Sequence, residues 1–239
     1  FLNLPDTLRA KIASGKLPLN QKHAMADVVL ALEILFVAPV RIKNLCGIEL
    51  DKNLIRHRDG YSLLFKPQEV KNRERLQFKL PPQTCSVIDW YIKTIRSERV
   101  RGETNALFLG EDGISLKSQG SLSIQIARKV KDYTGLAFNV HLIRHVASFL
   151  FLNQFPGGHH VMRLVLGHKS VETLARAYSG AEGKAAHALY DGVIRDLRDR
   201  HAPQKKRGRP SKSTSSPQSD YANMPLPDHG LIKKGRRSW

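Results

Sequence analysis

The apolar residues near the start of the chain are spaced as they are in helices. Residues 28–37 are apolar except for Glu33. This continuous run predicts a buried helix over residues 24–37, closed by Pro39. A second short helix is predicted from Arg41.

The pattern then changes to alternation between residues 54 and 80, where the period falls to about two. Residues 61–65 and 76–80 are strand-like runs, and Asp59-Gly60 marks a tight turn before the first run. The sequence therefore predicts a small antiparallel sheet.

Helical periodicity returns after Pro81. The further helices predicted from it cover residues 84–100, 119–133, 141–154, 159–166, 171–178 and 181–200. The expected fold class is α+β, mostly helical, with the sheet at one edge.

The two ends of the chain differ from its middle. Residues 1–20 contain Pro5 and Pro18, and we interpret them as a linker or as the end of a preceding DNA-binding domain. Because the chain opens without an initiator Met, we expect it to be a fragment. Residues 201–239 are rich in Pro, Ser, Lys and Arg and poor in apolar residues, which predicts a tail that is disordered on its own.

The charge of the chain points to its partner. The formal net charge is +18; residues 201–239 hold nine Lys or Arg against two Asp, or +7, so residues 1–200 carry the other +11. An excess of positive charge in both parts indicates a polyanionic partner, and we expect this partner to be double-stranded DNA. Charge for solubility alone is the alternative.

Composition argues against several other classes of protein. Cys46 and Cys85 lie in apolar contexts without CxxC spacing, so neither a disulfide framework nor a zinc site is indicated. The longest apolar run, residues 28–40, is shorter than the roughly 20 residues that cross a bilayer. We expect a reducing compartment, the bacterial cytoplasm with its nucleoid or a eukaryotic nucleus.

Several residues that bind anions or transfer protons fall within the predicted helix over residues 141–154. His141, Arg144 and His145 are spaced at i, i+3 and i+4, so they project from one face. On another face lie the residues that we expect to anchor this helix in the core: Leu142, Val146, Phe149 and Leu150. A zinc site built on the two histidines is disfavoured, because Arg144 beside them would repel a cation.

Taken in order, Arg41, Lys71, His141-x-x-Arg144-His145, Leu166-Gly-His168 and Tyr178 resemble the catalytic domain of the tyrosine site-specific recombinases, also called phage integrases. The resemblance covers residues 19–200, and we place the catalytic domain at residues 21–200. It implies a recombinase of a mobile element that cuts and rejoins DNA through a 3′-phosphotyrosine. It also implies a homo-oligomer on DNA, a tetramer in synapsis, that needs no metal or other cofactor.

The resemblance implies a role for each residue. Tyr178 would be the nucleophile, Arg41 and Arg144 would clamp the scissile phosphate, His141 and His168 would assist, and Lys71 would protonate the leaving oxygen. Arginine suits this task because its planar guanidinium donates two parallel hydrogen bonds without losing its proton.

Further DNA contacts are expected outside this set. Lys66, Arg73 and Arg75 belong to the segment that connects the two predicted strands, where an exposed basic tip suits the DNA backbone or simply solubility. In the tail, the motif KKRGRP resembles an AT-hook, which reads A·T-rich minor grooves, although a generic basic tail or a nuclear-import signal fits it as well. The core of this motif is Arg207, Gly208, Arg209 and Pro210.

The chain departs from the family pattern at two places. Asn44 stands three residues after Arg41, where an acidic residue is common, and Tyr178 follows His168 by ten residues instead of nine. One extra residue rotates a helical side chain by about 100°. A DNA-binding relative without catalytic activity is therefore one alternative, and a topoisomerase-like enzyme that relaxes DNA is another.

Overall fold

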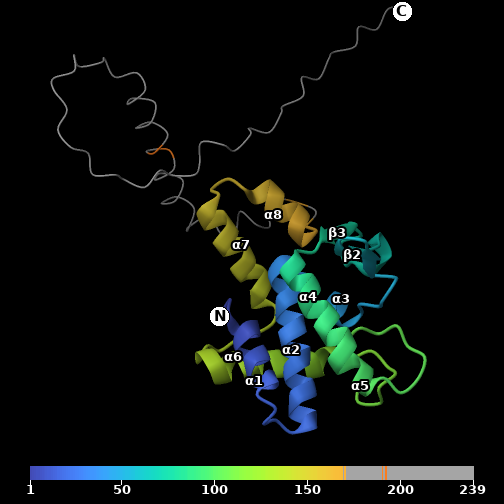
Figure 1. Ribbon diagram of the computed structural model, residues 1–239. Helices are drawn as coiled ribbons and strands as arrows, with labels where there is room; N and C mark the ends of the chain where they lie inside the picture. The colour runs from blue at the N-terminus through green and yellow to red at the C-terminus, as the bar shows by residue number, and fades with distance from the viewer. Residues whose placement is uncertain (169, 171–189, 191, 193–239) are drawn as a thin grey trace, which may run out of the picture. The chain divides into compact units, whose positions relative to one another are not determined.

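Helix α2 (Leu19–Val37) is the central element of the structure, a computed structural model that describes residues 1–168, 170, 190 and 192. Every residue of α2 from Met25 to Leu35 is buried. Four helices pack against it (Figure 1): α1 (Leu4–Ala13), α4 (Pro82–Trp90), α6 (Gln119–Thr134) and α7 (Leu142–Gln154). The continuous apolar run therefore forms the buried helix that the sequence predicts, although α2 begins five residues earlier than expected.

Helix α2 also buries a carboxylate. Asp27 is fully buried and forms ion pairs with Arg99 at 2.7 Å and with Lys117 at 2.8 Å. The hydroxyl of Tyr91 donates a hydrogen bond to the same carboxylate at 2.6 Å. Three separate segments are thus joined to the central helix by one charged group.

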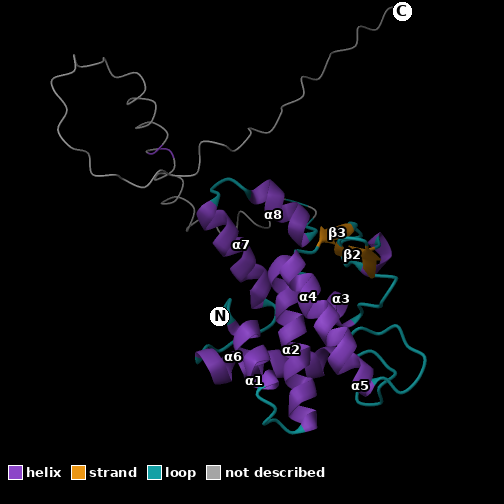
Figure 2. Ribbon diagram, viewed as in Figure 1, coloured by secondary structure: helices purple, strands orange, loops and turns teal. Residues whose placement is uncertain are grey.

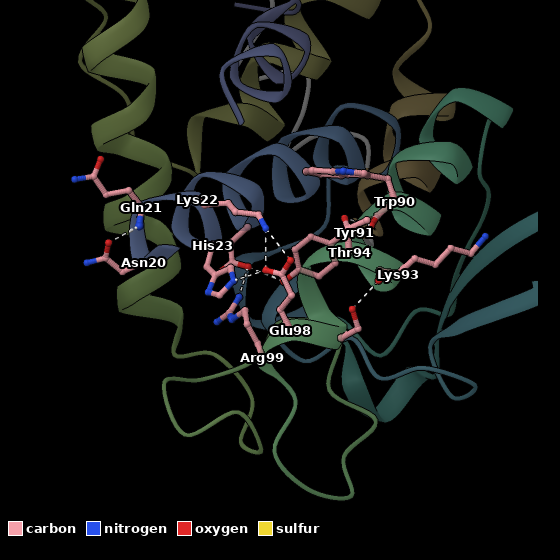
Figure 3. A network of polar contacts seen from close by, with 12 residues as sticks. Asn20, Gln21, Lys22, His23, Trp90, Tyr91, Lys93, Thr94, Glu98 and Arg99 are labelled. Atoms are coloured by element: carbon pink, nitrogen blue, oxygen red, sulfur yellow. Dashed lines mark hydrogen bonds and ion pairs between the residues drawn. The ribbon is translucent and has the colours of Figure 1, made fainter. Parts of the chain in front are cut away.

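A more exposed network joins the start of α2 to α5 (Ser97–Arg99). Lys22 Nζ and His23 Nε2 both contact the carboxylate of Glu98, at 2.8 and 3.1 Å (Figure 3). Helix α4 reaches α5 through a π-helical segment, η2 (Tyr91–Arg96), so the predicted helix over residues 84–100 is present but changes its winding.

A three-stranded antiparallel sheet follows α3 (Ile42–Cys46). Its strands, in the order β1-β2-β3, are β1 (Leu54–His57), β2 (Gly60–Phe65) and β3 (Leu76–Lys79). Leu63 pairs with Leu54 on one side and with Phe78 on the other. Figure 2 shows this sheet in orange beside a mostly helical structure, which confirms the predicted fold class.

Helix α8 (His159–Leu166) ends where the sequence predicts, at Gly167. Gly167 has φ 61°, in the left-handed region that favours glycine. A Cβ at this position would also lie 2.8 Å from a methyl group of Leu76 on β3. The close approach brings the end of α8 against the sheet.

One expectation about the start of the chain was incomplete, and one strand was not predicted. Residues 1–20 are not only a linker, because Leu4 and Leu8 of α1 are buried in the core. Strand β1 was not predicted, because its exposure does not alternate: Leu54 is buried, whereas Arg56 and His57 are both exposed. The predicted helices over residues 171–178 and 181–200 and the tail over residues 201–239 lie outside the described residues.

The expected core face of α7 was also wrong. Leu142, Phe149 and Leu150 are 43–47% exposed. The buried side of this helix carries Ile143, Arg144, Ser148 and Leu152 instead. Within the part of the chain that the structure describes, no helix has the length and apolar character needed to cross a membrane.

Candidate active site

Arg144 is the most buried of the predicted site residues that the structure describes, with 8% of its surface exposed. Its Nη1 donates to the backbone oxygen of Pro39, and its Nη2 donates to that of Leu166 at 2.8 Å. Burying a charged group is costly unless it is hydrogen-bonded. The two carbonyl groups offset that cost and fix the orientation of the guanidinium.

The same contacts bring Arg144 to Arg41. Pro39 and Arg144 are 105 residues apart in the sequence, and Pro39 is two residues before Arg41. Arg41 is the N-cap of α3 and is partly exposed. Arg144 is therefore hydrogen-bonded to the backbone segment that leads into Arg41, so the two arginines lie in one region.

His168 completes this cluster. The pKa of His168 is lowered by burial first, and then by the positive charges of Arg144, Arg41 and His145. Its Nε2 is 3.1 Å from Nη2 of Arg144. A guanidinium can only donate, so Nε2 must accept, and the proton of the neutral ring lies on Nδ1. Within the described part of the chain this buried Nδ1 has no hydrogen-bond partner, so it is a donor placed beside two arginines.

Lys71 lies in a turn that is hydrogen-bonded to the residue before His168. The backbone N–H of Arg73 donates to the oxygen of Val70 at 2.9 Å, which makes Lys71 and Asn72 the central residues of the turn. Lys71 is exposed. The side chain of Asn72 donates to the backbone oxygen of Gly167 at 2.7 Å. Since Gly167 precedes His168, the turn of Lys71 is attached next to the histidine.

Asn44 supports the segment before this turn. Its Nδ2 donates to the backbone oxygen of Glu69 at 2.8 Å, and the side chain is 7% exposed. An ionised carboxylate could not make this bond, because it has no proton to donate. The amide that replaces the common acidic residue is thus suited to its actual partner.

His141 is placed differently from the other predicted residues. It is the N-cap of α7 and is exposed, and its backbone N–H is bound by the side chain of Asn139 at 3.0 Å. His145 is exposed as well, although its charge acts on His168. The three residues spaced at i, i+3 and i+4 therefore differ in burial, because Arg144 is buried and both histidines are exposed.

The remaining predicted residues divide into two groups. Lys66, Arg73 and Arg75 are exposed around the connecting segment, where a DNA backbone could reach them. Outside the described residues lie Tyr178 and the AT-hook-like core Arg207, Gly208, Arg209 and Pro210, so their placement stays a prediction. Among the residues that the structure describes, no group of three or more His, Cys, Asp or Glu side chains is arranged to hold a metal ion.

The structure therefore gathers Arg41, Arg144 and His168, with the turn of Lys71 attached beside them. Their catalytic roles stay predictions. Sequence reasoning missed the contribution of Pro39 and Asn72. For Asn72 the one available signal was its position directly after Lys71, and the sequence held no signal for Pro39.

Comparison with known proteins agrees with this arrangement. The model of the phage integrase family matches residues 13–183, which is well over half of the chain. The chain belongs to the phage integrase family. No curated protein sequence is significantly similar to it.

Solved structures of tyrosine recombinases share the fold of this family member. The XerH site-specific recombinase bound to its palindromic difH substrate, in a post-cleavage complex, has a TM-score of 0.58 at 18% identity, over 78% of this chain and 51% of that one. The XerA recombinase has a TM-score of 0.56 at 15% identity, over 85% of this chain and 64% of that one.

The integrase of the Tn1549 transposon, in complex with a circular intermediate DNA, has a TM-score of 0.53 at 18% identity, over 77% of this chain and 63% of that one. This chain thus spans about half of XerH and less than two thirds of the other two chains. At these identities the likeness concerns the fold.

Proposed function

We propose that this chain carries the catalytic domain of a DNA recombinase that cuts and rejoins duplex DNA through a covalent phosphotyrosine. The observation that carries the proposal is the convergence of Arg41, Arg144 and His168, which are distant in the sequence, at one end of α8. Three donors of hydrogen bonds around one point suit a phosphate. Since this family acts on DNA in its solved relatives, the phosphate would be that of a DNA backbone.

In the proposed reaction the phenol of Tyr178 gives up its proton to solvent, its oxygen attacks the phosphorus, and the bond to the 5′ oxygen breaks. Charge develops on the non-bridging oxygens, where Arg41 and Arg144 would donate hydrogen bonds. The 5′ oxygen leaves with a proton from the ammonium of Lys71. The phosphotyrosine retains the energy of the broken bond, so the reverse attack by a 5′ hydroxyl can rejoin the strand without ATP.

The partner would be duplex DNA, bound by several copies of the chain. The net charge of +18 and the exposed Lys66, Arg73 and Arg75 support contact with the backbone. A role in a mobile element is supported by the likeness to the transposon integrase. Joining of two DNA molecules requires more than one active site, which favours a homo-oligomer that is a tetramer in synapsis.

A pool of nicked suicide duplexes with randomised sequence tests the proposal. On such DNA a short fragment diffuses away after cleavage, so a covalent adduct accumulates. We expect an adduct with the wild-type protein, none with Tyr178→Phe, and an undiminished amount with Tyr190→Phe, the matched control on a tyrosine that is 64% exposed. Binding without any adduct would instead favour a DNA-binding relative that has lost the reaction.

Two observations favour that second candidate: Asn44 in place of an acidic residue, and the ten-residue step from His168 to Tyr178. A third candidate, a relaxing enzyme, would form the adduct and remove supercoils with little preference for sequence. Sequencing the DNA ends held in the adducts separates it from a recombinase, because a recombinase enriches one site.

The tail would add affinity of its own. We propose that the AT-hook-like motif holds A·T-rich DNA near the catalytic domain. Deletion of residues 201–239 should weaken binding to A·T-rich probes more than to G·C-rich probes. Equal losses on both would reject the motif and leave a generic basic tail.

A further inference from the structure

The turn that carries Lys71 is attached on both sides by asparagine side chains. Before the turn, Asn44 Nδ2 donates to the backbone oxygen of Glu69 at 2.8 Å. After Lys71, Asn72 Nδ2 donates to the backbone oxygen of Gly167 at 2.7 Å. The first bond comes from the helix that Arg41 caps, and the second ends beside His168.

We propose that Asn44 and Asn72 are positioning residues that set the Lys71 ammonium against the two-arginine site. The inference rests on the proposed function, in which Lys71 protonates the leaving oxygen. It adds that two side-chain hydrogen bonds hold the turn of Lys71 in place, one from the helix that Arg41 caps and one to the residue before His168.

The end of α8 is the junction of these bonds. Its last residue and the two that follow offer successive acceptors: the oxygen of Leu166 binds Arg144, the oxygen of Gly167 binds Asn72, and Nε2 of His168 binds Arg144 again. Arg144 and the turn of Lys71 are therefore fastened to adjacent peptide groups. Gly167 cannot shift freely, because it is packed against Leu76 of β3.

The other side of the turn is equally well supported. The carboxylate of Glu69 accepts from the backbone N–H of Lys66 at 2.8 Å and from Asn53 Nδ2 at 3.1 Å. Val70, between Glu69 and Lys71, is 3% exposed and belongs to the core. Because these contacts fix Glu69, the hydrogen bond from Asn44 connects the turn firmly to α3.

Both bonds require a side chain that donates a hydrogen bond, which an ionised carboxylate cannot do. At position 44 an aspartate would place two oxygen atoms 2.8 Å apart with no proton between them when it is ionised. An aspartate at position 72 would face the oxygen of Gly167 in the same way. Substitution of either asparagine should therefore release one side of the turn while Lys71 itself remains.

The test uses DNA in which sulfur replaces the bridging 5′ oxygen. A thiolate is a far better leaving group than an alkoxide and needs no proton, so cleavage of this DNA does not depend on Lys71. On ordinary DNA, Lys71→Ala should lower the cleavage rate on the order of 100-fold or more. Asn72→Ala should lower it by about 10- to 100-fold, the scale of a small misplacement. On the sulfur-linked DNA both variants should cleave within about threefold of wild type, because the missing proton transfer is the step that this substrate bypasses.

Controls separate positioning from folding. Asn72 is partly exposed, so its variant tests the proposal even where the buried Asn44→Asp fails to fold. Asn105→Ala is the matched control: the residue is exposed, and the backbone oxygen that binds Leu50 is unchanged by the substitution. The double variant Lys71→Ala/Asn72→Ala should be no slower than Lys71→Ala alone, since both act through one proton.

Equal slowing of Asn72→Ala on both substrates, or no slowing on either, would overturn the proposal. A wild-type protein that forms no adduct with either DNA would instead overturn the proposed function, and this inference with it. The two failures are therefore distinguishable.

Discussion

Replacement of Arg144 by lysine tests whether the shape of its side chain, and not only its charge, builds the site. The guanidinium binds two buried carbonyl groups, those of Pro39 and Leu166, and also His168. A lysine ammonium is a point charge and cannot reproduce this fork. Loss of one charge-assisted bond to a buried carbonyl costs about 1.5–3 kcal/mol of unfolding free energy. Loss of one preorganised donor to the phosphate lowers cleavage on the order of 100- to 1000-fold.

Urea unfolding and the suicide-DNA assay measure the two effects separately. Arg96→Lys is the matched control, because Arg96 also binds two backbone oxygens, of Ala106 at 2.8 Å and Thr104 at 2.5 Å, but from η2. It should lose comparable stability and, while folded, cleave at the wild-type rate. If Arg144→Lys remains folded and cleaves DNA as the wild type does, the reasoning about Arg144 is refuted.

Three further predictions concern the fold and the state of the site. Asp27→Ala leaves the buried Lys117 and the partly buried Arg99 without their ion pairs and should lower the unfolding free energy by about 3–5 kcal/mol in urea titrations; a loss below about 1 kcal/mol would contradict this. The lowered pKa of His168 means that the unfolded chain binds its proton more readily, so the contribution of His168 to stability is complete above about pH 6.5 and is lost as the pH falls; a His168→Gln variant with an unchanged stability profile below that pH would argue against it. Burial raises the pKa of the Cys46 thiol to about 11, so a thiol reagent at pH 8 should label it only after unfolding; rapid labelling of the folded protein that disappears in Cys46→Ser would contradict this.

The sequence predicted the elements that have strong local signals. The apolar run of α2, the alternation in β2 and β3, and the stop of α8 at Gly167 are all present. Each signal is local, since it depends on a few neighbouring residues and the backbone they favour.

Where a helix faces depends on its partners, and this the sequence could not supply. On α7 we expected Leu142, Phe149 and Leu150 in the core, but Arg144 occupies the buried side. The reason is tertiary: the carbonyl groups of Pro39 and Leu166 compensate the buried charge, and neither is close to Arg144 in sequence. The packing of α1 on α2 is also a tertiary contact, so the sequence pattern did not indicate it.

The candidate site was predictable as a set of residues but not as a set of contacts. The motifs identified Arg41, Lys71, Arg144 and His168. The hydrogen bonds that the side chains of Asn44 and Asn72 donate join segments 25 and 95 residues apart, and no spacing rule indicates them.

The central claim is that Arg41 and Arg144 bind one phosphate. The most direct measurement is a crystal structure of the protein with nicked duplex DNA and vanadate, which adopts the geometry of a phosphate under attack. We predict that both guanidinium groups donate to the non-bridging oxygens of the vanadate, with the Tyr178 oxygen at one apex. Vanadate and the nick bound elsewhere on the protein, or contacted by only one of the two arginines, would contradict the account.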